Sequence, residues 1–182
     1  MVWPASIVEP NVTITPWSQE ACGALTHIGM TALGAAASAA YPADALAMFF
    51  PFYVTKPVIT ANMFTYNGAT AIGNVDVGVY DEAATRLVSS GATAQSGTST
   101  LQTYNITDTL FGPGLFYLAI TLDDTGAGLG TLFRGTIAQA MFGRAIGMAQ
   151  QATQTTLPAA ATLAAFAQTY IPLFGLTVRS VV

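Results

Sequence analysis

The stretch that decides the fold runs Gly73-Asn74-Val75-Asp76-Val77-Gly78-Val79-Tyr80-Asp81. Its valines fall on one side of an extended strand, and the residues between them fall on the other. Strict alternation of this kind is typical of a strand that packs one face on a core and leaves the other face free. A polar turn ending at Thr85 leads into a second short stretch, Arg86–Ser90. The two stretches together predict an antiparallel hairpin.

Similar extended stretches recur along the chain, separated by turn residues. We expect strands at Met48–Thr55, Val58–Tyr66, Leu101–Ile106, Leu115–Leu122, Thr131–Arg134 and Leu173–Val178. Pro51 indicates an edge or a bulge because proline cannot donate to a strand ladder. Leu115–Leu122 is the strongest continuous strand candidate, which indicates a central strand. Closely spaced strands of this kind predict an all-β fold, a jelly-roll-like antiparallel β-sandwich or a barrel.

Two regions depart from this pattern. Residues 1–40 contain several prolines, and Ser18 could cap a helix that runs to about Leu33. We interpret residues 1–40 as a partly helical N-terminal arm or packing segment, or alternatively as the first layer of the domain formed by residues 41–182. Glycines weaken the partial helical spacing of Ile137–Ala152, and the tract that begins at Leu157 is typical of a covering loop.

The composition is short of charge. Hydrophobic residues make up 52% of the 182 residues, charged residues 8%, and the mean hydropathy is +0.52. Soluble domains usually carry about 25% charged residues. Ala21–Ala40 is long enough to span a membrane, but it is polar in places and no basic residue precedes Lys56, so neither a membrane span nor a secretory signal is expected. A hydroxyl-rich monomer remains open, but the composition favours a subunit covered by neighbours.

The residues that usually carry chemistry are few. The net charge is −4 and the five basic residues are scattered, so nucleic acid is not an expected partner. Cys22 and His27 are each the only residue of their type, and no nucleophile–histidine arrangement surrounds them.

Asp123 and Asp124 could ligate calcium, and paired acids could hydrolyse glycans, but neither motif is complete. The glycine-rich stretch Gly126–Gly130 is interpreted as a loop. We expect neither an enzyme nor a bound cofactor or metal.

Two tyrosines precede turns and are therefore the ones we expect to be exposed. Tyr66 and Tyr80, together with Asn67 and Asp81, form the candidate ligand-binding set, with a carbohydrate as the expected ligand. A sugar-stacking platform could also include other aromatic residues, but most of these are expected to fill the core: Phe49, Phe50, Phe52, Tyr53 and Phe64.

Several segments resemble a β-sandwich module that is common in structural proteins of tailed bacteriophages. The ending Tyr170–Thr177 is similar to the close of that module, and the resemblance covers roughly residues 41–182. Similar hairpins also occur in carbohydrate-binding sandwiches. The segments that carry the resemblance are Tyr41–Ala43, Phe49–Phe52, Tyr66–Gly68, Gly73–Asp81, Arg86–Gly91 and Gly112–Ala119.

This resemblance implies a virion part. The expected role is a capsid decoration or cement subunit that binds the major capsid protein and its own copies, as a homo-oligomer such as a trimer, in a virion assembled in the host cytoplasm. The alternative is a carbohydrate-binding host-adsorption module of a phage fibre. The family provides no catalytic residues to carry over, and residues 1–40 have no counterpart in it.

Overall fold

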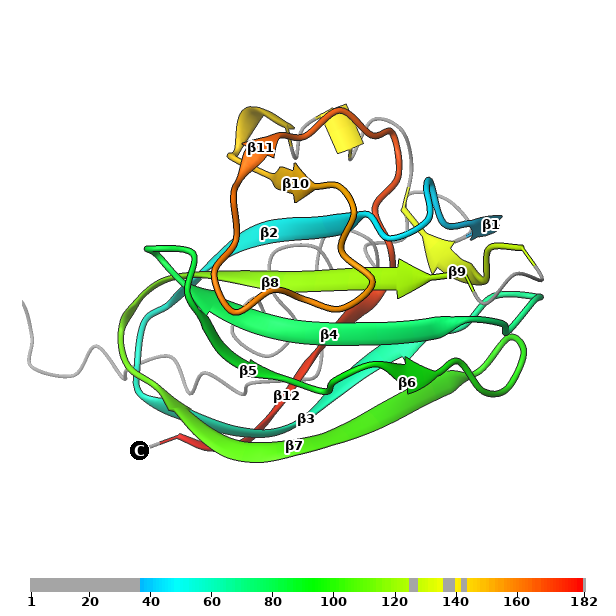
Figure 1. Cartoon of the computed structure of the whole chain (residues 1–182). Coiled ribbons are helices and arrows are strands. Elements are labelled where there is room, and N and C mark those ends of the chain that lie inside the picture. The colour runs from blue at the N-terminus through cyan, green and yellow to red at the C-terminus, as the bar shows by residue number, and fades with distance from the viewer. Residues whose placement is uncertain (1–36, 125–127, 136–139, 142–143, 182) are drawn as a thin grey trace, which may run out of the picture.

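The computed structural model describes residues 37–124, 128–135, 140–141 and 144–181, which form an all-β, antiparallel sandwich (Figure 1). This confirms the predicted fold class. The predicted helix that begins near Ser18, together with Cys22 and His27, lies outside the described residues. The last residues of the expected arm, Ala37–Ala40, form strand β1, which pairs with β9 (Thr131–Arg134).

The sandwich consists of a large and a small sheet that face each other. The large sheet has the order β11 (Ala164–Ala165), β10 (Ala149–Gln151), β2 (Ala47–Val54), β8 (Gly114–Asp123), β4 (Asn74–Asp81) and β5 (Arg86–Ser89), and β6 (Thr93–Ala94) also pairs with β4. The small sheet has the order β12 (Phe174–Val181), β3 (Val58–Tyr66) and β7 (Leu101–Phe111).

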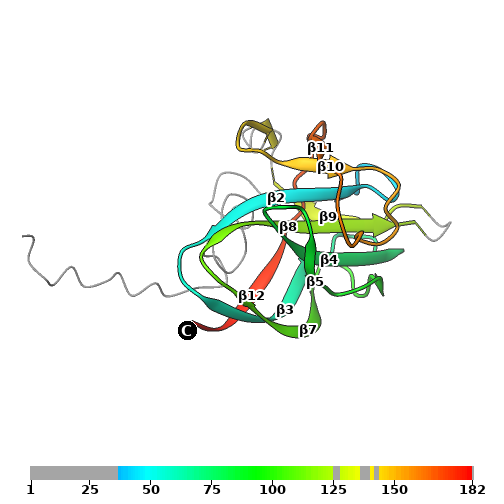
Figure 2. The ribbon, with the colours of Figure 1, turned by 60° about the vertical axis from the view of Figure 1, so that its left-hand side comes forward.

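The connections wind the chain as in a jelly roll. β2 pairs with β8 in the large sheet, and β3, which follows β2, pairs with β7, which precedes β8. The two connections therefore pass from one sheet to the other side by side, at the left of Figure 2. This double crossing, which is the winding expected of a jelly roll, brings segments far apart in sequence into one core.

Most strand predictions are confirmed. β4 and β5 form the predicted hairpin, and β8 lies at the centre of its sheet between β2 and β4. β10 pairs with β2 only as far as Phe49, so Pro51 lies where β2 has a neighbour on one side only. β7 continues five residues past the expected end at Ile106, to Phe111.

The interior is filled from both sheets by aromatic and aliphatic side chains. The valines of β4, Leu118 of β8 and Met63 of β3 are fully buried there. The Phe50 ring meets the Phe174 ring edge-on, with 5.3 Å between their centroids. Burial of each such side chain stabilises the fold by roughly 1.5–3 kcal/mol. Because these side chains come from both sheets, their burial holds the two sheets together.

The expectation of a free outer face on β4 is wrong. Asp76, Gly78 and Tyr80 are buried as completely as the valines between them. Residues 152–163, which we call the strap, run across the outside of β8 and β4 in Figure 1. Leu157 of the strap belongs to a second apolar cluster, with Ala47, Phe49, Tyr80, Ala119 and Ala149. The strap confirms the predicted covering loop, but alternation within β4 could not reveal which strand it covers.

Candidate binding surface

Asn67 is a structural residue in this fold. It lies at the end of β3 with none of its side chain exposed. Its amide nitrogen donates to three oxygens and its amide oxygen accepts from two donors, and the partners are Ser96 O, Gly97 O, Gln102 Oε1, Thr65 Oγ1 and Gln95 Nε2. Tyr66 is half-buried, with its ring edge-on to Phe133 at 4.7 Å. Asn67 therefore ties the loop at residues 95–102 to β3.

Tyr80 is fully buried, so the expectation that it is exposed is wrong. Its ring meets that of Phe49 edge-on at 5.2 Å, and its hydroxyl donates to the carbonyl of Pro158 in the strap at 2.6 Å. Burial raises the pKa of the Tyr80 hydroxyl well above its usual range. Tyr80 thus holds the strap to the sheet.

Asp81 closes the turn between β4 and β5. Its Oδ1 accepts a hydrogen bond from Thr85 N at 2.8 Å. Gln95, which bonds Asn67, also donates its backbone N–H to Gly73 O, so Asn67 lies near the start of β4. The eight residues of β4 span roughly 23 Å. The structure therefore does not bring Tyr66 and Asn67 together with Tyr80 and Asp81.

A buried carboxylate under the strap is a second anchor for it. Asp76 is 1% exposed, and its Oδ2 accepts from Leu157 N at 3.0 Å. Arg86 donates to the carbonyl of Leu157. Burial raises the pKa of Asp76, although the Leu157 N–H, the Arg86 charge and two serine hydroxyls act in the opposite direction. The loss of hydration therefore destabilises the ionised carboxylate more than these partners stabilise it.

The raised pKa of Asp76 predicts a dependence of stability on pH. The folded chain binds the Asp76 proton more tightly than the unfolded chain does. The contribution of Asp76 to the free energy of unfolding is therefore largest below its ordinary pKa of 3.8, and it declines as the pH rises through the raised pKa of the folded state. Asp76→Asn keeps an acceptor for Leu157 N and removes the titration. In urea unfolding between about pH 4 and pH 7, we expect the stability of wild type relative to Asp76→Asn to fall as the pH rises. A difference that is constant or rises with pH would contradict this cause.

The acids at the end of β8 hold the neighbouring backbone. Asp44 Oδ1 accepts from Asp124 N at 2.8 Å, and Asp124 Oδ1 accepts from Gly128 N at 3.1 Å. Burial, Asp44 and Asp124 together raise the pKa of Asp123. Within the described part of the chain, no group of three or more His, Cys, Asp or Glu side chains is placed to hold a metal ion.

An exposed aromatic surface lies beside the strap, on the outer face of the large sheet. Phe50, Phe52 and Val54 point into the sandwich, so Pro51 and Tyr53, which alternate with them, point outward. Their cross-strand partners on β8 are Tyr117 for Pro51 and Leu115 for Tyr53. Tyr53 is 55% exposed, and the other three side chains are half-buried. We call these four residues the tyrosine surface.

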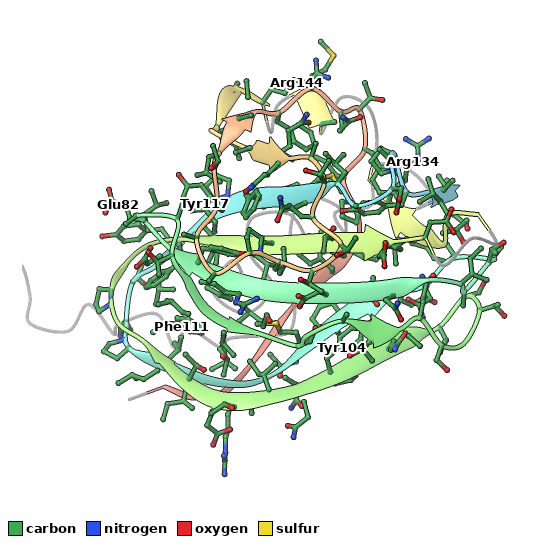
Figure 3. The ribbon with its side chains drawn as sticks, viewed as in Figure 1. Glu82, Tyr104, Phe111, Tyr117, Arg134 and Arg144 are labelled. Carbon is green, nitrogen blue, oxygen red and sulfur yellow. The ribbon has the colours of Figure 1, made fainter. Side chains whose placement is uncertain are left out.

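One edge of the tyrosine surface adjoins the turn between β4 and β5. Tyr117 pairs with Tyr80, and Figure 3 shows Tyr117 and Glu82 at the same end of the sheet. Asp81 pairs with Phe116, whose ring packs on Phe111 at 5.4 Å in the interior. Cross-strand partners share a face, so Asp81 does not share the face of Tyr117.

Sequence reasoning named Tyr53 in a possible sugar-stacking platform but favoured core filling for most of that set, and it did not single out Tyr117. Both lie inside long apolar runs that indicated core filling. A signal for both was available in the alternation along each strand. Each tyrosine has a polar hydroxyl, and its neighbours in sequence are apolar residues that point to the other face.

The chain matched no family model, no curated protein and no solved structure in three comparisons. None of the helical residues that the structure describes belongs to a helix long and apolar enough to cross a membrane. The function therefore has to be inferred from this chain's own residues.

Proposed function

We propose that this protein is a structural subunit that packs against copies of itself. The finer proposal, which follows the resemblance of residues 41–182, is a capsid decoration subunit of a tailed bacteriophage that binds the shell and its own copies. The observation that supports this proposal most is that β7 is a long edge strand with few residues that would block pairing.

β7 is a long edge strand with little protection. It has 11 residues, and among the strands that the structure describes it pairs only with β3. Its sequence contains no lysine, arginine or proline, which are the residues that usually block edge-to-edge pairing. Its one charged residue, Asp108, is paired with Arg179 of β12. Its register with β3 is regular from Leu101 to Asn105 and shifts only after that point.

The outward side of β7 exposes two large aliphatic side chains, and its one charged residue, Asp108, is neutralised by Arg179. Leu101 is 52% exposed and Leu110 is 60% exposed, and Thr103 and Asn105 between them are exposed as well. Depletion of charge with retained apolar side chains is typical of the centre of a protein interface. A second subunit that packed here would cover these side chains and could satisfy the free edge of the strand.

Charge placed on this side should weaken self-association. We expect the double variant Leu101→Lys/Leu110→Lys to associate at least tenfold more weakly than the wild type in sedimentation velocity, because lysine would be desolvated in the interface. The control is Ile146→Lys, which also replaces an exposed aliphatic side chain, but on the segment after Arg144, at the opposite end of the molecule from β7 in Figures 1 and 3.

Equal association of both variants and the wild type would contradict a role for β7. The capsid decoration role is tested separately. The purified chain is incubated with heads of the phage that encodes it. Binding to heads that the Leu101→Lys/Leu110→Lys variant lacks is the expected result, and no binding by the wild type would overturn the decoration role.

A further inference from the structure

We propose that the tyrosine surface is a binding site for a neutral oligosaccharide. The site lies on the outer face of the large sheet, and β7 lies at the edge of the small sheet, so this inference does not rest on the proposed self-association.

The two tyrosines are neighbours on one face of the sheet. Tyr53 and Tyr117 come from adjacent, hydrogen-bonded strands and are diagonal neighbours, since Tyr53 pairs with Leu115 and Tyr117 pairs with Pro51. Diagonal neighbours on one face of a sheet lie roughly 7–8 Å apart, which is within the reach of a disaccharide that lies across both rings. The aromatic faces suit the C–H faces of sugar rings, and the phenol hydroxyls can donate to or accept from sugar hydroxyls.

The surface is held in place by the cluster beneath the strap. Tyr117 packs against the second apolar cluster together with Ala161 and Leu163 of the strap. The same row of outward residues on β2 continues from Phe49, which the strap covers, to Pro51 and Tyr53, which it leaves open. A ligand would therefore meet a Tyr117 side chain that packing already orders, which lowers the ordering entropy that binding costs.

The size of the surface fits a small ligand better than a protein. With Tyr53 at 55% exposure and its three neighbours half-buried, the exposed area is on the order of 300 Å². A stable protein interface needs about 800 Å² from each partner. One to three sugar rings would cover the tyrosine surface completely.

The charge around the surface indicates a neutral ligand. The four residues are uncharged. The charged residues nearest in sequence to this end of the sheet are Lys56 after β2, and Asp81, Glu82 and Arg86 at the turn between β4 and β5, and their formal charges cancel. Arg86, the nearest other cation in sequence to β4, donates to the strap carbonyl of Leu157. No net charge would therefore select a sulfated or uronic acid chain over a neutral one.

The test is calorimetric titration of the full chain with maltohexaose, cellohexaose and chitohexaose, and with a sulfated heparin hexasaccharide. We expect at least one neutral hexasaccharide to bind and the sulfated one not to bind more tightly. Tyr53→Ala should weaken binding about tenfold, which corresponds to about 1.4 kcal/mol, whereas Tyr53→Phe should bind within about threefold of the wild type.

Tyr66→Ala is the matched control, because Tyr66 is a half-buried tyrosine on the small sheet. Tyr117→Ala provides a second variant, with its fold checked by circular dichroism. The proposal is overturned if none of the neutral hexasaccharides binds, if the sulfated one binds best, or if Tyr66→Ala weakens binding as much as Tyr53→Ala. It is also overturned if Tyr53→Ala leaves sugar binding intact and reduces self-association instead, because the surface is then a subunit contact.

Discussion

Tyr80→Ala is expected to lower the free energy of unfolding by about 4 kcal/mol. The change removes a fully buried ring that packs edge-on against Phe49 at 5.2 Å, and it leaves a cavity between the sheet and the strap. It also removes the 2.6 Å hydrogen bond to Pro158 O. The measurement is urea unfolding followed by circular dichroism.

Two tyrosine variants separate the causes of this loss. Tyr80→Phe retains the ring and loses only the hydroxyl, so it should cost about 1 kcal/mol. Tyr53→Ala removes a ring that is 55% exposed and should cost less than about 1 kcal/mol. If Tyr80→Ala costs no more than Tyr53→Ala, the strap does not seal the outer face of β4.

Asn67→Ala should be comparably destabilising, by about 3–5 kcal/mol. The Asn67 amide makes hydrogen bonds with five partners from Thr65 and the loop at residues 95–102. Alanine would leave Ser96 O, Gly97 O and the Gln95 amide with fewer partners, and water has no access to an Asn67 side chain that is 0% exposed. Equilibrium unfolding in urea measures the loss.

Asn105→Ala is the matched control for that variant. Asn105 is an exposed asparagine on the outward side of β7, where water replaces any partner when unfolding is measured on the dissociated chain. We expect its free energy of unfolding to stay within about 0.5 kcal/mol of the wild type. A loss of stability in Asn67→Ala as small as that in Asn105→Ala would mean that the amide network does not fix the loop.

The local strand pattern could be predicted from the sequence because it depends on neighbouring residues. Val58–Tyr66 and Thr131–Arg134 are strands with the predicted bounds, since turn residues and alternation mark both ends. The burial of Tyr80 could not be predicted, because its partner Pro158 lies 78 residues away along the chain. The same holds for Asn67, which an Asn-Gly pair marks as a surface turn but which the distant loop at residues 95–102 buries.

The two proposed surfaces are compatible in one molecule. β7 closes one edge of the small sheet, and the tyrosine surface, of which Figure 3 labels Tyr117, lies on the outer face of the large sheet. A subunit that docked through β7 would leave Tyr53 and Tyr117 open to a ligand. The burial of Tyr80 is consistent with two separate surfaces. The strap covers and stabilises the part of the outer face around Tyr80, and the tyrosine surface lies beside that part.

The central claim is that a chain with 8% charged residues uses its exterior for contacts with its own copies. Sedimentation equilibrium of the unaltered full chain, from nanomolar to high micromolar concentration, tests it most directly. We expect a defined oligomer, several times the 18.8 kDa mass of one chain, that dissociates only on dilution. A single species of 18.8 kDa that stays soluble at every concentration would contradict the account.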